Sequence, residues 1–244
     1  MTLPDAKTLY AVIDGSWPAA AKQALGPWTI RLDDSGSSRV SAATAELPVT
    51  DADIPQAEDA MREAGQKPLF MIREGEDALD AMLAARGYVI KDPVNMYAAP
   101  VAEIATDRAP PVTTFEVWPP LAVQADIWAA GGVGPGRLAV MDRARHPKTT
   151  ILGRLNDRPA GTVFVGTAGN CAMIHALEIA TAHRRQGLAR HMTRAAAFWA
   201  QGQGVTWLTL VTTQVNSGAN ALYTSLGMVL VGQYHYRTLP EVSP

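Results

Sequence analysis

The residues best suited to chemistry lie in one short basic stretch, residues 183–189, which reads His-Arg-Arg-Gln-Gly-Leu-Ala. It follows an apolar segment typical of a buried strand, residues 171–179, and precedes an amphipathic segment typical of a helix, residues 188–201. The first turn of a helix has unpaired N–H groups and forms the positive end of the helix dipole. Gly187 allows a close backbone approach, and the two arginines attract negative charge. The stretch therefore predicts a site for an anion, in particular a diphosphate.

The distribution of charge favours the same interpretation. The chain of 244 residues has a formal net charge of −2, which argues against a general nucleic-acid-binding protein. From Ile179 to Pro240, however, the sequence has five arginines and no lysine, aspartate or glutamate. This window carries +5, so the remainder of the chain carries −7. A basic segment in an acidic chain favours binding of a small anion; a solvated basic surface is the alternative.

The composition is ordinary for a folded protein, with 48% hydrophobic and 18% charged residues. No apolar run of about 18 residues occurs, so we expect no transmembrane helix. Residues 1–5 lack the basic and apolar segments of a secretory signal. The single cysteine, Cys171, lies in an apolar segment, where we expect it to be buried rather than reactive. These features predict a cytoplasmic protein. The five histidines show no zinc-type spacing, so we expect no metal.

The elements that position the basic stretch belong to the C-terminal part of the chain. Four prolines in residues 107–120 predict a linker ahead of this part. The glycine-rich residues 131–136 follow a helix and lack the Lys-Ser/Thr of a phosphate loop, so we interpret them as a flexible connection. The sequence pattern predicts helices at 121–130, 137–145, 188–201 and 219–226, and strands at 149–155, 160–165, 171–179, 205–211, 228–232 and 234–239.

The N-terminal part has its own series of elements. Residues 81–88 are similar to residues 221–228 at an offset of 140. In both places a strand precedes the helix and strands follow it, so we interpret the N-terminal half as a shortened copy of the C-terminal half. We expect helices at 6–13, 53–64 and 78–86, and strands at 28–32, 39–44, 68–72, 88–90 and 95–101, the last two as a hairpin.

Two motifs in this order resemble the GNAT N-acetyltransferase superfamily. Residues 184–189 match the motif Gln/Arg-x-x-Gly-x-Gly/Ala, which follows a strand end, here Leu177-Glu178-Ile179. Residues 216–228 match Asn-x-x-Ala-x-x-Leu-Tyr-x-x-x-Gly-Phe. The departures are Ala189 for the second glycine and Met228 for the phenylalanine. The resemblance covers residues 122–239.

The resemblance implies acetyl-coenzyme A as acyl donor and a primary amine of a small molecule or peptide as acceptor. The amine would attack the thioester directly, with Tyr223 as general acid for the leaving thiolate. The strand end would pair with the pantetheine arm, the loop amides and arginines would hold the diphosphate, and an asparagine would contact the arm. The implied donor-binding residues are Leu177, Ile179, Arg184, Arg185, Gln186, Gly187, Leu188, Ala189 and Asn216.

The general base has two candidates, His175 and Glu178. Some family members have a histidine at the first position, and the pKa of histidine suits proton transfer near neutrality. Because side chains alternate along a strand, His175 and Glu178 should point to opposite faces unless a bulge intervenes. At most one of them is therefore expected to face the acceptor.

We expect an α/β (α+β) fold with two tandem GNAT-like units, built of mixed, mostly antiparallel sheets flanked by helices. The units are a degenerate domain, 1–106, and the acetyltransferase domain, 121–244, joined by the linker 107–120. Residues 46–52 contain two acids and no base, so we expect no acetyl-coenzyme A in the first unit. That unit would instead cover a sheet edge and wall the acceptor site, and its Trp17 and Trp28 would line that pocket or belong to the core.

A non-catalytic acyl-coenzyme A-binding or regulatory module with the same fold is the alternative function. We expect no nucleic-acid or membrane partner, and a monomer or a homodimer. The identity of the acceptor and the preferred length of the acyl chain stay open.

Overall fold

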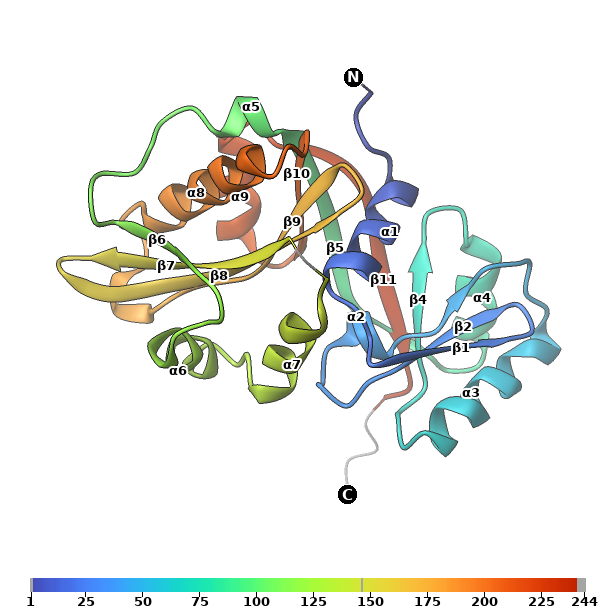
Figure 1. The fold of residues 1–244 in the computed structure, drawn as a ribbon. Coiled ribbons are helices and arrows are strands. Elements are labelled where there is room, and N and C mark those ends of the chain that lie inside the picture. The colour runs from blue at the N-terminus through green and yellow to red at the C-terminus, as the bar shows by residue number, and fades with distance from the viewer. Residues whose placement is uncertain (1, 146, 241–244) are drawn as a thin grey trace.

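The computed structural model describes residues 2–145 and 147–240, whose strands form two sheets (Figure 1). The fold is α/β, with mostly antiparallel sheets flanked by helices, as expected. In the large sheet only β9 and β10 are parallel neighbours. The small sheet has the order β1 (Ala21–Leu25), β2 (Trp28–Leu32), β3 (Thr44–Ala45). The large sheet has the order β4 (Leu69–Arg73), β11 (Val229–Thr238), β5 (Val89–Pro100), β10 (Trp207–Thr213), β9 (Cys171–Ile179), β8 (Arg158–Ala168), β7 (Lys148–Leu155), β6 (Thr114–Val117).

Helices cover both faces of the large sheet. Around β8 and β9, one face carries α1 (Ala6–Ser16), α6 (Ala122–Ala130) and α7 (Pro135–Arg143). The other face carries α5 (Val101–Ile104), α8 (Leu188–Gly202) and α9 (Ser217–Ser225). The apolar side of α8 packs on that second face, which buries the stripe predicted from its periodicity.

The N-terminal part adds a smaller layer. The short helix α2 (Ser38–Ser41) lies between β2 and β3 in the chain, and α3 (Ile54–Glu63) and α4 (Asp77–Ala85) follow. Apolar residues of the small sheet, α3 and α4 pack against the β4 residues Phe70 and Ile72 in a separate core cluster. The small sheet therefore buries its apolar side on an outer strand of the large sheet.

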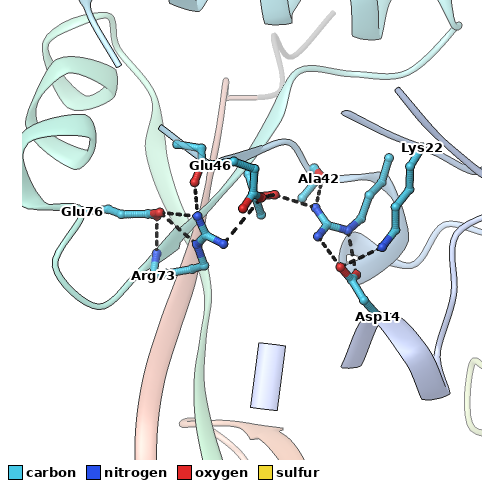
Figure 2. Close-up of polar contacts among 9 residues, drawn as sticks. Asp14, Lys22, Ala42, Glu46, Arg73 and Glu76 are labelled. Atoms are coloured by element: carbon cyan, nitrogen blue, oxygen red, sulfur yellow. Dashed lines mark hydrogen bonds and ion pairs between the residues drawn. The ribbon is translucent and has the colours of Figure 1, made fainter. Parts of the chain in front are cut away.

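A network of charged groups fixes α1 to the small sheet, as Figure 2 shows. Asp14 of α1 accepts hydrogen bonds from both ends of the Arg31 guanidinium on β2, at 2.9 and 2.8 Å. Lys22 of β1 pairs with the same carboxylate at 2.8 Å. Arg73 of β4 pairs in turn with Glu76 at 2.8 Å. Because α1 also packs on β8, β9 and β11, this network positions the N-terminal residues that meet β9.

The repeat at an offset of 140 is present as a strand–helix–strand unit. The helix α4 begins at Asp77 and α9 at Ser217, and the following strands begin at Val89 and Val229. The last strand of each unit pairs with strands of the other unit. The C-terminal strand β11 lies between β4 and β5, and the N-terminal strand β5 lies between β11 and β10. The two segments thus share one sheet. The division into domains at 107–120 stays a prediction, and this segment contains β6, which pairs with β7.

Three predictions of local structure were wrong. A single strand, β5 (Val89–Pro100), takes the place of the hairpin predicted at 88–101, and a single strand, β11 (Val229–Thr238), takes the place of the two strands predicted at 228–239. The pairing of these two strands shifts register twice, and such bulges interrupt the regular alternation of side chains along a continuous strand. Residues 39–44 begin as the helix α2, and Ala43 then bonds to the backbone of Leu69 and Met71.

The remaining C-terminal elements lie close to their predicted places, and β9 has the predicted bounds, Cys171–Ile179. Within the described ranges, no helix combines the length and the apolar character that crossing a membrane requires.

Candidate active site

A cleft opens where β9 and β10 separate. The two strands pair from Cys171 and Trp207 to Ile174 and Leu210, and no further. A cavity of about 760 Å³ occupies the space beyond, between the end of β9 and the start of α9. Its walls contain eight of the residues predicted to bind the donor and two of the three predicted to be catalytic, namely Leu177, Ile179, Arg184, Arg185, Gly187, Leu188, Ala189, Asn216, Glu178 and Tyr223.

The loop before α8 presents unpaired backbone donors to this cleft. Gly187 is the N-cap of α8 with φ of 85°, and Arg185 also has a positive φ, 62°. Within the part of the chain that the structure describes, the N–H groups of residues 186–189 have no backbone acceptor. Consecutive free N–H groups at the start of a 15-residue helix attract an anion through both hydrogen bonds and the helix dipole. This is the arrangement that a diphosphate requires.

The basic side chains around the loop differ in what they contact. Arg190 donates a hydrogen bond to the Ser225 Oγ at 2.8 Å, along the wall of the cleft. Arg185 is exposed to solvent. Arg184 instead turns back to the end of β9, where it pairs with Glu178 at 2.9 Å and donates to the carbonyl oxygen of Ile179 at 3.0 Å. Arg184 thus contacts the strand end directly, and Arg185 and Arg190 are the arginines left to face an anion.

On the opposite wall, α9 supplies Asn216 and Tyr223. The Asn216 Oδ1 accepts a hydrogen bond from the backbone N–H of Ala219 at 3.1 Å and so caps the helix. Tyr223 is 6% exposed and borders the cavity. Burial raises the pKa of Tyr223 to about 12. Its hydroxyl therefore keeps its proton at neutral pH, as a group that donates to a developing thiolate requires.

A bulge in β9 determines where the two candidate bases point. Phe164 of β8 pairs with His175 of β9, and Thr162 of β8 pairs with Glu178 of β9. The step is two residues on β8 and three on β9, so β9 has one extra residue there. Ala176 has a φ of 48°, and its carbonyl oxygen accepts a hydrogen bond from the Trp128 Nε1 at 2.7 Å. The bulge turns His175 and Glu178 to the same face, which carries α1 and α6, rather than to opposite faces.

His175 is enclosed by the N-terminal half. It is 2% exposed and stacks on Trp17 with ring centroids 4.9 Å apart. Arg39 Nη1 lies 2.8 Å from the His175 Nδ1, and Ser16 Oγ lies 2.8 Å from the Nε2. An arginine only donates, so Nδ1 is the acceptor and the ring is the neutral Nε2–H tautomer. Burial, and then the charge of Arg39, hold the pKa of His175 well below its ordinary value.

Glu178 is the candidate base that lies at the cleft. Its side chain borders the cavity and is 20% exposed, whereas His175 does not border the cavity. A Cβ at Gly131 would lie 2.5 Å from the Glu178 Cδ, so the connection between α6 and α7 passes directly over this carboxylate. Geometry therefore favours Glu178 over His175 as base, and the roles of all site residues stay predictions.

Sequence reasoning missed the residues that support the bulge. Trp128, Ser16 and Arg39 have no role in the two motifs, yet they contact Ala176 and His175. Trp128 lies in a predicted helix, and the N–H of a buried tryptophan normally has a hydrogen-bond partner. This is the sequence feature that could have indicated a contact between the helix and a neighbouring strand. No local pattern points to Arg39, because its helix replaces a predicted strand.

Three further expectations concern residues outside the cleft. Trp17 and Trp28 are each 1% exposed and belong to core clusters. Cys171 is buried, as predicted, and burial raises the pKa of its thiol to about 11. The described residues contain no group of three histidine, cysteine, aspartate or glutamate side chains that could hold a metal ion. His146 lies outside the described residues.

A sequence model of the acetyltransferase (GNAT) family matches residues 103–228, more than half of the chain. The chain belongs to the GNAT acetyltransferase family. The matched range contains β9, the loop before α8, and Tyr223.

Relatives of known name or structure agree with this family. N-acetyltransferase family 8 member 3 of Rattus norvegicus is 38% identical over 60 residues, which is 25% of this chain and 26% of that protein. The chain thus matches only about a quarter of that relative's length. A GCN5-related N-acetyltransferase from Kribbella flavida has the same fold, with a TM-score of 0.72 and 20% identity over 97% of this chain and 95% of that one. A tandem GNAT protein from the clavulanic acid biosynthesis pathway matches with a TM-score of 0.57 and 14% identity, over 83% and 76% of the two chains.

Proposed function

We propose that this GNAT protein transfers an acetyl group from acetyl-coenzyme A to a primary amine of a small molecule or peptide. The observation that carries the proposal is the cleft between β9 and β10, which has free N–H groups at one end and Tyr223 in its wall. Family membership supports acetyl transfer. The donor, the amine acceptor and the route of the reaction are our inference.

The donor fits the cleft in two places. The free N–H groups of residues 186–189 match the oxygens of the diphosphate. Beyond Ile174, β9 has no partner strand on its β10 side, so the backbone of Leu177 and the N–H of Ile179 are available to the amide groups of the pantetheine arm, whereas the Ile179 carbonyl oxygen already accepts from Arg184. In this proposal the thioester lies beside Tyr223 and the bulged part of β9.

The reaction follows from the groups around that point. The amine nitrogen attacks the thioester carbon, forming a C–N bond, and the C–S bond breaks. Tyr223 gives its proton to the departing thiolate, and Glu178 takes the proton that the amine loses, directly or through a water. The Ala176 carbonyl held by Trp128 fixes the strand that presents Glu178. No step needs a covalent enzyme intermediate, and Cys171 with its raised pKa is a poor nucleophile.

The N-terminal half contributes structure rather than a second donor site in this proposal. It supplies Ser16, Trp17 and Arg39 to the face of β9 that carries the candidate base. Its counterpart of Tyr223 is Leu83, which is fully buried in the core. We therefore infer one active site per chain, in the part that contains the basic loop, and tandem units of which only the second is catalytic.

The experiment that separates an enzyme from a binding module is thiol release from acetyl-coenzyme A with a broad panel of amines. Tyr223→Phe should lower kcat by about 10²-fold or more and change the affinity for acetyl-coenzyme A little. Tyr97→Phe is the matched control, because Tyr97 is also buried, has its ring centroid 6.2 Å from that of Tyr223, and donates its hydroxyl to Asn220 outside the cavity lining.

If the wild type binds acetyl-coenzyme A but releases no thiol with any amine, the non-catalytic binding module is the correct function. If Tyr223→Phe turns over as fast as the wild type, the assignment of Tyr223 as general acid is wrong.

A further inference from the structure

Most buried or partly buried arginines in the described ranges pair with a carboxylate. Such pairs are made by Arg31, Arg73, Arg86, Arg154, Arg194 and Arg237. In the described ranges, three partly buried arginines make no ion pair: Arg39, Arg137 and Arg190. Arg190 borders the cleft proposed for the donor. Arg39 and Arg137 have no such assignment. A guanidinium withdrawn from water without a counter-ion is costly, so both point to an anion that is supplied from outside.

The two arginines come from different halves of the chain, on segments that pack against each other. Arg39 lies on α2, and Arg137 lies in the first turn of α7. The start of α7 packs on the turn before α2, since a Cβ at Gly136 would lie 2.6 Å from the Ser35 Cα. Farther along α7, Arg143 pairs with Asp33 of the same turn. The contact between the halves therefore holds α2 and the first turn of α7 together.

The charges of the two arginines act on each other. Burial lowers the pKa of Arg137, and the positive charge of Arg39 lowers it further. The carboxylate of Asp92 on β5 raises the pKa of Arg137. However, Asp92 is exposed and forms no ion pair with either arginine in the described structure. An added anion between the two guanidinium groups would relieve their repulsion.

The arginines lie on the acceptor side of β9. Arg39 binds His175 directly, and His175 and Glu178 share one face of the strand, opposite α8. The connection that lies over Glu178 at Gly131 continues into the turn of α7 that carries Arg137. The stretch of β9 from His175 to Glu178 lies opposite the two-residue step from Phe164 to Thr162 on β8, which corresponds to about 7 Å. A ligand of modest size spans that distance.

We propose that Arg39 and Arg137 bind a carboxylate of the acceptor, so that the preferred substrates are small primary amines that also carry a carboxylate. This inference rests on the proposed function. The planar guanidinium fork matches the two oxygens of a carboxylate, and such charge-assisted hydrogen bonds are about twice as strong as neutral ones. The amine then reaches Glu178 and the thioester while the carboxylate stays at the arginines.

The test compares a series of ω-amino carboxylates of increasing chain length with the corresponding ω-amino amides, which differ only in charge. With the wild type, kcat/KM for the best carboxylate should exceed that of its amide by about tenfold or more. In Arg137→Gln and in Arg39→Gln this ratio should fall to about one. Arg158→Gln is the control, because it removes the same charge at an exposed position at the start of β8 and should retain the wild-type ratio.

The outcomes separate this inference from the proposed function. If amines are acetylated but the carboxylate has no advantage, or if Arg137→Gln keeps the wild-type ratio, the arginine site is refuted while the function stands. If no amine is acetylated, the function fails, and calorimetric titration of the same carboxylates decides the arginine site by itself. Binding to the wild type but not to Arg137→Gln supports the site, and absence of binding refutes it. Unchanged thermal unfolding verifies that the variants are folded.

Discussion

Gly187→Ala tests the loop before α8 most sharply, because Gly204 offers a matched control at the other end of the same helix. Both glycines have a positive φ, 85° and 73°, and a Cβ added at either would meet no atom within 4 Å. Alanine at either position therefore costs only backbone strain, about 1–2 kcal/mol. For a chain of this length that lowers the Tm by about 2–8 °C. The two variants should be destabilised alike.

Their affinities for acetyl-coenzyme A should differ. At position 187, strain relieved by a change of φ rotates the free N–H groups of residues 186–189 away from the diphosphate. A hydrogen bond to a charged group contributes about 1.5–3 kcal/mol. Loss of one such bond lowers affinity about 10-fold to 100-fold. Gly204 follows the C-terminal end of α8 and does not border the cavity, so Gly204→Ala should bind like the wild type.

Calorimetric titration with acetyl-coenzyme A, together with thermal unfolding, measures both effects. Equal affinities for the two variants, whether both are normal or both are weakened, would refute the idea that the N–H groups before α8 hold the diphosphate.

Three further predictions concern the strand face and the N-terminal half. Because the folded-state pKa of His175 is lowered from 6.5, the unfolded chain binds a proton that the folded chain does not, and stability falls as the pH drops below about 6.5. In His175→Gln, the free energy of unfolding measured in urea should fall less between about pH 6.5 and pH 5, and turnover should be retained. Loss of turnover with intact binding of acetyl-coenzyme A would make His175 catalytic. Glu178→Gln should lower kcat by about 10²-fold with little change in the affinity for acetyl-coenzyme A, and an unchanged kcat would exclude it as base. Arg31→Ala leaves the partly buried Asp14 without its main partner and should cost about 3 kcal/mol in urea unfolding, whereas loss of the more exposed partner in Lys22→Ala should cost under about 1 kcal/mol; equal costs would contradict the network.

The part of the site that could be predicted is the part that is contiguous in sequence. The strand end, the loop and the start of α8 follow one another within residues 171–192, so local periodicity and one glycine were enough to predict a strand, a loop and a helix there. The second motif adds Tyr223, and the structure brings it to the same cavity. What binds in that cavity remains our proposal.

The face of β9 to which the side chains of His175 and Glu178 point depends on contacts with residues far away in sequence. Alternation along β9 predicted opposite faces for His175 and Glu178, with a bulge as the exception. The extra residue at the bulge shows only in the pairing with β8, and its carbonyl is held by Trp128 from α6. Neither partner is visible in the local pattern of β9.

The N-terminal half was predicted less well for the same reason. The repeat at an offset of 140 could be found from residues 81–88, but the interleaving of β5 and β11 depends on which strands pair across the two halves. Residues 39–44 show strand-like alternation, yet α2 forms there and the next residues bond to β4. Arg39 was consequently missed, although it bonds to His175.

A labelled acetyl group shows whether the protein carries out the transfer. The wild type is incubated with acetyl-coenzyme A labelled in its acetyl group and with an amine, and mass spectrometry quantifies the acetylated amine alongside the free thiol. We predict equal amounts of thiol and labelled N-acetyl product, both lost together in Tyr223→Phe. Thiol released without acetylated amine, or acetyl-coenzyme A bound with neither product formed by any amine, would contradict transfer in this cleft.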